Sequence, residues 1–189
     1  QAFEEEWAEY CKAKYCVGVS SGTDALYLAL RALTKPKDQV ITTPFTFFAT
    51  TQAIIHVGCF PGYVDVDPHT GNLPNMGFGS QVAIPVNLYG RPGIWEGSNV
   101  IEDSAQAHGL PHHGRISCWS FYPTKNLGAV GQAGTVVTND LDIANAIREM
   151  RTYGERERFI HYDITGNYRM DELQAAILRV KLPHVDEWN

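Results

Sequence analysis

Hydrophobic and polar residues divide the chain into two alternating kinds of segment. Short apolar runs rich in Val, Ile, Tyr and Phe are bounded by Gly, Pro, Asn and Asp, a pattern typical of strands. We expect seven strands, at residues 15–20, 39–45, 62–67, 82–90, 99–105, 118–123 and 134–140. Because these runs are so apolar, we expect a sheet that is covered on both faces.

Helical patterns lie between and after these runs. Residues 21–33 form a nearly continuous apolar helix suited to packing on a sheet, and residues 48–58 have the same character. Residues 141–154 and 169–182 predict two further helices, and the acidic amino terminus is also helical in pattern. Strands that alternate with helices predict an α/β protein with a mostly parallel seven-stranded sheet and helices on both faces.

Two connections do not fit a complete design of this kind. Only the eight residues "RPGIWEGS", 91–98, join the fourth and fifth expected strands, whereas a parallel crossover normally needs about a dozen residues or more. Residues 68–81 also join two expected strands and contain turn-forming residues without a helical period. Either these strands pair differently, or the chain is a shortened version of a larger design.

Composition and charge narrow the choice of partners. With 189 residues, of which 44% are hydrophobic, the chain can form one sizeable core, so we expect a single domain. The net charge of −6 comes from interspersed charges without a basic stripe, so neither nucleic acid nor an anionic membrane is an expected partner. No apolar run approaches the length of a membrane span. The four cysteines form no CxxC pair, which favours a reducing, cytoplasmic location.

One lysine stands apart from other charges. Lys125 follows the apolar run "CWSFYP" and precedes the small-residue stretch "NLGAVGQAG", which offers no carboxylate. A lysine held in such a place can be tuned for covalent chemistry. The alternative is a lysine at the end of a strand whose ammonium group reaches water.

Two other strand ends also carry polar groups. Ser21, Gly22 and Thr23 lie where the first expected strand turns into its helix, which predicts a phosphate site or else an ordinary helix cap. Asp103 ends the fifth expected strand, where a carboxylate can act as a metal ligand, a general base or a partner for a cationic ring nitrogen. Ligands of open α/β sheets collect at this edge.

The nearby histidines do not favour a metal. The stretch "HGLPHHG", from His108 to Gly114, contains Gly and Pro that prevent a helical histidine face, and no Cys or carboxylate has the spacing of a metal site. We expect no metal, and we expect His112 and His113 to be solvated loop residues. A phosphate anchor, a pyridinium partner and a reactive amine are together what pyridoxal phosphate requires.

Seven stretches carry a more specific resemblance. In this order, the sequence contains "SSGTDALYLAL", "PFTFFAT", "VDVDPHTGN", "VNLYG", "VIEDSAQAHG", "SFYPTKNLGAVGQAG" and "GNYRMDELQAAIL". The chain resembles the DegT/StrS family of sugar aminotransferases, which have the fold type I pyridoxal phosphate architecture. The resemblance implies that residues 1–189 are the cofactor-binding large domain, without the family's amino-terminal start and carboxyl-terminal small lobe. It also implies pyridoxal 5'-phosphate as the cofactor.

The same resemblance implies roles for residues around the reacting part of the cofactor. Lys125 would form the Schiff base, and Asp103 would pair with the pyridine nitrogen and keep it protonated. Gln106 would approach the ring hydroxyl. His108 is a candidate substrate contact.

Further residues match the family's binding pattern. Gly22, Thr23 and Ser120 match the phosphate cradle, and Phe47 matches an aromatic residue that stacks on the ring, with a plain core residue as the alternative. Asn167 matches an asparagine that reaches into the neighbouring subunit's site, so the resemblance implies a homodimer with shared active sites.

The implied reaction moves an amino group from an amino acid, usually glutamate, to a keto group on a nucleotide-linked sugar. The region between Asp103 and Lys125 is shorter than the family pattern leads us to expect, which adds to the two short connections. The alternative function is therefore a non-catalytic or impaired remnant that binds pyridoxal phosphate or a nucleotide-sugar. A Rossmann dehydrogenase is disfavoured because no G-x-G-x-x-G motif follows a strand.

Overall fold

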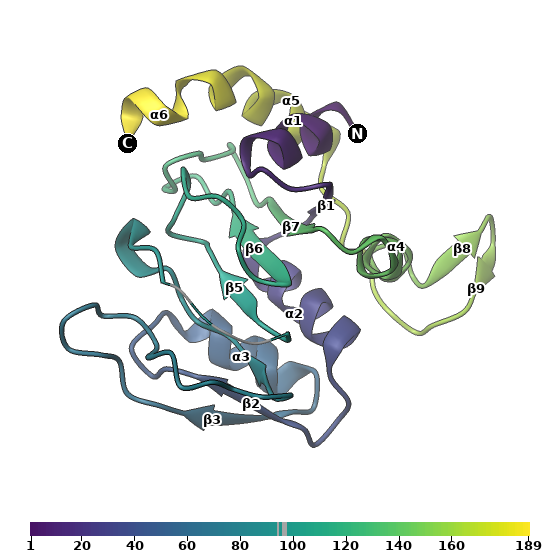
Figure 1. The fold of residues 1–189 in the computed structure, drawn as a ribbon. Coiled ribbons are helices and arrows are strands. Elements are labelled where there is room, and N and C mark those ends of the chain that lie inside the picture. Colours follow the sequence, from purple (N-terminus) through teal and green to yellow (C-terminus); the bar gives the residue numbers. More distant parts are fainter. Residues whose placement is uncertain (94, 96–97) are drawn as a thin grey trace.

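The computed structural model describes residues 1–93, 95 and 98–189 and shows a central sheet between two layers of helices (Figure 1). Strands β1, β7, β6 and β5 pair in that order, and β3, β2 and β4 form a second set. Parallel bridges from Ala83 to Val100 and from Val86 to Asp103 join β4 to β5. The strand order is therefore 3-2-4-5-6-7-1, which confirms the expected seven-stranded sheet.

In the described chain, strands and helices alternate as expected from α1 to β3, whereas β4 to β7 follow one another with only the short 3-10 helix η1 among them. The strands of the sheet are β1 Tyr15–Val19, β2 Gln39–Thr42, β3 Phe60–Tyr63, β4 Val82–Ala83, β5 Ile101–Asp103, β6 Ile116–Ser120 and β7 Gly134–Thr138. The helices are α1 Ala2–Tyr10, α2 Gly22–Leu33, α3 Phe48–His56, η1 Leu88–Gly90, α4 Leu141–Met150, α5 Glu172–Lys181, η2 Leu182–His184 and α6 Val185–Trp188.

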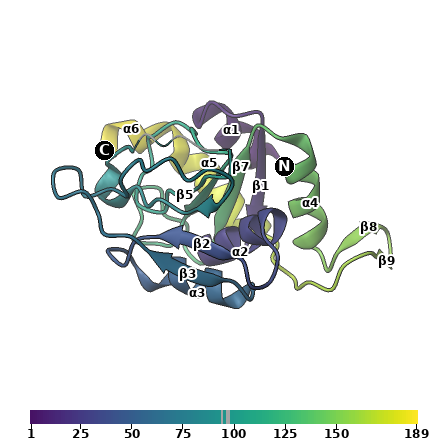
Figure 2. The same ribbon diagram turned by 60° about the horizontal axis from the view of Figure 1, so that its bottom comes forward.

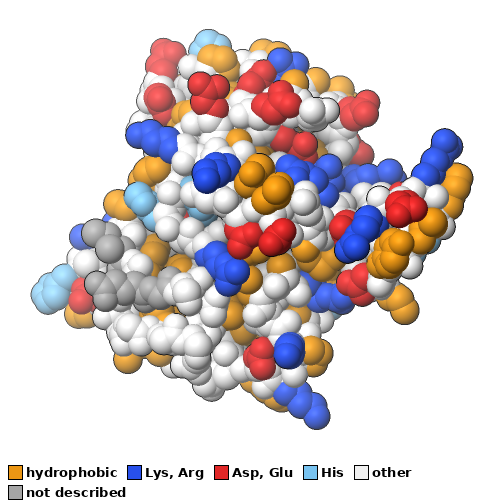
Figure 3. All heavy atoms as spheres, turned by 45° about the vertical axis from the view of Figure 1, so that its right-hand side comes forward, with side chains coloured by type: hydrophobic (Ala, Val, Ile, Leu, Met, Phe, Trp, Pro, Cys, Tyr) orange, Lys and Arg blue, Asp and Glu red, His pale blue; other side chains and the backbone are white. Residues whose placement is uncertain are grey.

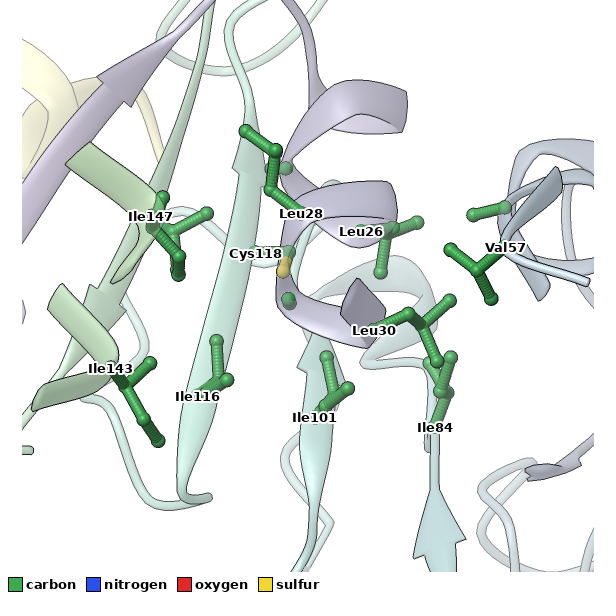
Figure 4. Close-up of a cluster of buried hydrophobic side chains, with 14 of the residues drawn as sticks. Leu26, Leu28, Leu30, Val57, Ile84, Ile101, Ile116, Cys118, Ile143 and Ile147 are labelled. Atoms are coloured by element: carbon green, nitrogen blue, oxygen red, sulfur yellow. The ribbon is translucent and has the colours of Figure 1, made fainter. Parts of the chain in front are cut away.

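The side chains that alternate along the strands pack into two hydrophobic cores, one on each face of the sheet. On one face, Ile116 and Cys118 of β6 pack with α2, α3 and α4, and Figure 4 shows Leu26, Leu28 and Leu30 of α2 in this cluster. On the other face, Trp119 packs with α1, α5 and α6. Because neighbouring residues of a strand point to opposite faces, one apolar run supplies both cores. Helices therefore cover both faces of the sheet (Figure 2).

Several expected boundaries and directions need correction. Strand β7 runs antiparallel to both neighbours, so the sheet is mixed. The third strand covers Phe60–Tyr63 rather than 62–67, because it pairs with β2 from Gln39 to Thr42 and β2 ends there. Beyond it, the Asp67 side chain accepts hydrogen bonds from the backbone N–H groups of His69 and Thr70 and shapes a turn. The fourth strand is two residues long and ends well before residue 90. The short link 91–98 includes residues 94, 96 and 97, which lie outside the described residues.

An arm that the sequence patterns do not predict extends from the body. Strands β8 Glu155–Glu157 and β9 Ile160–His161 form an antiparallel hairpin after α4 (Figure 1). Phe159, Tyr162 and Ile164 in or near it are 78%, 58% and 93% exposed. On the face shown in Figure 3, hydrophobic, basic and acidic side chains are intermingled, including those of the arm. No helix among the described residues is long and apolar enough to cross a membrane.

Candidate functional site

A cavity of about 450 Å³ lies at the carboxyl ends of β1, β5 and β6. Its wall includes most of the residues singled out in the sequence: Gly22, Thr23, Phe47, Asp103, Gln106, Ser120 and Lys125. Its volume is in the range of sites for small molecules and cofactors. The sheet therefore brings into one cavity residues that are far apart in the sequence.

The amino terminus of α2 forms one end of this cavity. The Ser21 side chain caps the helix by accepting a hydrogen bond of 3.1 Å from the N–H group of Asp24, as the helix-cap alternative expects. The preceding amides, of Gly22 and Thr23, have no intrahelical acceptor because of their position in the first turn. A methyl group at Gly22 would lie 2.6 Å from Ser120 Cβ, so only glycine allows this close approach. The cap and a potential anion site therefore coexist here.

Asp103 at the end of β5 is a buried carboxylate with two donors. Its Oδ2 accepts a hydrogen bond of 2.7 Å from the Thr50 hydroxyl, and its Oδ1 accepts one of 3.2 Å from the N–H group of Ala105. Burial raises the pKa of Asp103, and the two hydrogen bonds and the charge of Lys125 oppose that rise. A cation placed beside Asp103 in the cavity would favour its ionised form further.

Lys125 lies in the loop after β6 and is half-buried. Burial lowers the pKa of its ammonium group, and the negative charge of Asp103 acts in the opposite direction. The net lowering increases the fraction of neutral amine, which is the nucleophilic form. The alternative of a lysine that only reaches water is disfavoured, because Lys125 lines the cavity together with Asp103.

Phe47 is an exposed residue of the cavity wall. It is the N-cap of α3, and 76% of it is exposed to solvent, so the alternative of a plain core residue is wrong. An aromatic ring on the wall of a cavity offers a flat surface to a planar ligand.

His108 and Asn167 lie outside the cavity wall. His108 is buried between Trp7, Trp119 and Phe121, and its Nε2 lies 2.9 Å from the backbone oxygen of Ser120. Burial lowers its pKa to about 4, so the ring is neutral at neutral pH. This geometry does not support the expected substrate contact. The His108 ring lies in the aromatic core and contacts the backbone at the end of β6. Asn167 is exposed in the segment after the arm, and its Oδ1 accepts a hydrogen bond from Arg169.

His112 is buried, so the expectation that it is a solvated loop residue is wrong, whereas His113 is exposed. The Nδ1 of His112 lies 2.6 Å from the Ser117 hydroxyl, and that hydroxyl donates to the Glu102 carboxylate. Glu102 also accepts a hydrogen bond from the backbone N–H of His113. The partners of His112 lie on β5 and β6, so its own loop sequence gave no sign of them.

Other cavity residues carried no chemical signal in the sequence. They are Leu26, Thr46, Ala49, Val86, Leu88, Ala105, Tyr122, Thr124 and Gln132. Small and polar residues of this kind are common in loops, so only the fold shows that they belong to the cavity.

The described residues fit pyridoxal phosphate. A phosphate group could bind at Gly22, which has no side chain to block it, and could accept hydrogen bonds from the first-turn amides and the Ser120 hydroxyl. The exposed ring of Phe47 suits a planar ring, the buried Asp103 carboxylate suits a ring cation, and the Lys125 amine suits an aldehyde.

Comparison with protein families identifies a match over the whole chain. The model of the DegT/DnrJ/EryC1/StrS aminotransferase family matches residues 1–189.

Similar proteins and structures agree with that match. The chain is 41% identical over 208 residues to a pleiotropic regulatory protein of Geobacillus stearothermophilus, covering 98% of this chain and 56% of the relative. It is 39% identical over 218 residues to the dTDP-3-amino-3,4,6-trideoxy-alpha-D-glucose transaminase of Streptomyces venezuelae, covering 100% of this chain and 56% of the relative. The crystal structure of S. venezuelae DesV in complex with a ketimine intermediate has a TM-score of 0.90 and 36% identity, covering 98% of this chain and 56% of that one.

The lengths of these alignments bear on the short connections. The chain spans little more than half the length of the curated relatives it matches. The alignments run over more positions than the 189 residues of the chain, so these relatives carry internal residues that this chain lacks. These lengths agree with the alternative of a shortened design, without locating the additional residues of the relatives.

Proposed function

The chain belongs to the DegT/DnrJ/EryC1/StrS aminotransferase family, and we propose that it is the cofactor-binding large domain of a pyridoxal phosphate-dependent sugar aminotransferase. The observation that carries this proposal is that one cavity contains Lys125, Asp103 and the close contact between Gly22 and Ser120. An amino acid, glutamate by family resemblance, would be the donor, and a nucleotide-linked keto-sugar would be the acceptor. Relatives named as dTDP-sugar and UDP-sugar aminotransferases support this choice of acceptor.

The role proposed for each residue follows from its position in the cavity. Bound pyridoxal phosphate supplies an aldehyde that captures amines and a ring that withdraws electrons from the attached carbon. Lys125 would hold the cofactor through Nζ and, once displaced by the donor, would accept and return a proton at that atom. Asp103 would keep a positive charge on the ring nitrogen, and the phosphate would lie against Gly22, Thr23 and Ser120.

The remaining assignments follow the resemblance. Gln106 lines the cavity and would orient the ring hydroxyl, while the exposed ring of Phe47 would stack on the cofactor. A cytoplasmic location is part of the proposal, and the four buried free cysteines are compatible with a reducing compartment.

A single-turnover amination tests the proposed reaction. The protein is first converted to its aminated cofactor form with glutamate and then mixed with a nucleotide-linked keto-sugar. We expect an amino-sugar product in an amount up to the loaded sites. Its rate is expected to be low, because the chain lacks internal residues found in relatives, and a misplacement of about 1 Å can cost on the order of 100-fold in rate.

The second candidate function is cofactor or nucleotide-sugar binding without amine transfer. It is favoured by the relative named as a pleiotropic regulatory protein and by the shortened connections. The single-turnover experiment separates the two functions: saturable binding of the keto-sugar without any product would support the binding function and contradict transfer.

Asn167 provides a test of the proposed homodimer. Its exposure and its place in the segment that follows the projecting arm suit contact with a second copy. If each site is built from two chains, mixing the Asn167→Ala chain with the Lys125→Ala chain should restore one complete site per mixed dimer. We expect more cofactor to be fixed by borohydride on the Asn167→Ala chain after mixing than before.

The control for this experiment is a chain with both substitutions, which cannot supply Asn167 and should give no increase. Sedimentation velocity at micromolar concentration should show a dimer in each case. An Asn167→Ala chain whose cofactor capture is unchanged by mixing would rule out the shared site.

A further inference from the structure

The first turn of α3 touches the carboxylate at the end of β5. The Thr50 hydroxyl donates a hydrogen bond of 2.7 Å to Asp103 Oδ2, and 0% of Thr50 and 6% of Asp103 are exposed. We propose that Thr50 is a positioning residue, which holds Asp103 ionised and turned into the cavity for the nitrogen of the bound cofactor ring. This inference rests on the proposed function, because it assigns Asp103 to the ring.

The two hydrogen bonds of Asp103 fix its orientation. Thr50 binds Oδ2 from α3, and the N–H group of Ala105 binds Oδ1 from the strand's own continuation. An ionised carboxylate has about four acceptor positions, so two donors leave acceptor capacity for a ligand. Asp103 lines the cavity and Thr50 does not, so Thr50 would act on the cofactor only through Asp103.

The position of Thr50 favours negative charge on Asp103. Thr50 is in the first turn of α3, where the helix dipole stabilises anions. Its β-branched side chain restricts rotation, so the hydroxyl has few alternative orientations. Thr46, which lines the cavity, places its Oγ1 3.4 Å from the Thr50 Oγ1.

The balance of forces on Asp103 gives the expected sign. Burial raises its pKa, and the Thr50 hydroxyl is the largest of the effects that lower it, ahead of the Ala105 amide and Lys125. Another ionisable neighbour is the Cys118 thiol on β6, whose own pKa is raised well above its usual value, so it is neutral. Loss of the Thr50 hydroxyl should therefore raise the pKa of Asp103 and favour the protonated form, which cannot attract a ring cation.

Thr50→Val removes the hydroxyl and keeps the shape, Thr50→Ser restores a hydroxyl, and Thr51→Val is the matched control. Thr51 is on the same helix, and its hydroxyl lies 3.1 Å from the Tyr63 hydroxyl rather than near Asp103. The first readout uses the cofactor-free protein: NMR titration of ¹³C-carboxyl aspartate, with the Asp103 signal assigned by its loss in Asp103→Asn. We expect a midpoint at higher pH in Thr50→Val and near-parental midpoints in Thr50→Ser and Thr51→Val.

The second readout is affinity for pyridoxal phosphate. Thr50→Val should raise the Kd by about 10-fold at neutral pH, because a hydrogen bond to a charged group contributes about that factor. The loss should shrink as the pH is raised. An unchanged Asp103 midpoint in Thr50→Val, or a displaced midpoint that Thr50→Ser does not restore, would overturn the inference. Failure of the parent protein to bind the cofactor would instead overturn the proposed function.

Discussion

Replacing Lys125 by alanine is expected to lower single-turnover amine transfer by about 1,000-fold or more, because it removes the amine that holds the cofactor and carries the proton. Burial lowers the pKa of this lysine, so the parent side chain is more reactive than an exposed one. The variant should also lose the covalent form of the cofactor, measured as protein-bound absorbance in the visible range after gel filtration.

Lys35→Ala is the matched control for this prediction. Lys35 lies in the exposed turn between α2 and β2, outside the cavity, and its loss should leave transfer and absorbance unchanged. Transfer at the parental rate by Lys125→Ala would contradict the assignment of the reactive amine.

Replacing Asp103 by asparagine is expected to lower amine transfer by about 200-fold to 5,000-fold. The substitution keeps the shape of the side chain and removes the negative charge that would face the ring cation. Removal of one partner of a buried charge pair costs about 3–5 kcal/mol, which corresponds to this range of rates. Initial rates of the loaded protein would measure the effect, and a parental rate would show that Asp103 does not act on the ring.

The same substitution should maintain or raise the stability of the cofactor-free protein at pH 7, although it lowers the rate of amine transfer. Because burial raises the pKa of Asp103, the folded state binds the proton more tightly than the unfolded state does. This contribution is fully present below the ordinary pKa of aspartate and is lost as the pH rises through the raised value. Cofactor-free Asp103→Asn should therefore unfold at the same temperature as the parent protein or a higher one at pH 7. This advantage should disappear at pH 3, and a less stable variant at pH 7 would contradict the sign.

The order of strands and helices could be predicted because the apolar patterns are local. Residues 21–33 and 141–154 each gave a helix close to the expected bounds, since their apolar faces pack on the sheet in the expected way. The direction of β7 could not be predicted, because a strand's pattern of burial is the same in either direction. The hairpin of β8 and β9 was missed because its exposed, charged residues show no alternation.

The candidate site was predictable where chemistry follows a strand end. Lys125 and Asp103 lie far apart in the sequence, yet strand ends that meet at one edge of the sheet bring them into one cavity. Their roles remain predictions. The contact between Thr50 and Asp103 could not be predicted, because it joins residues on two elements whose packing no local pattern describes. His112 was misplaced for the same reason.

The most direct test of the account is to find where pyridoxal phosphate attaches. The protein is incubated with the cofactor, reduced with borohydride, digested and mapped by mass spectrometry. We predict that the cofactor is fixed on the peptide that contains Lys125. Fixation on Lys35 or Lys181 with Lys125 unmodified would contradict the central claim that this cavity holds the cofactor through Lys125.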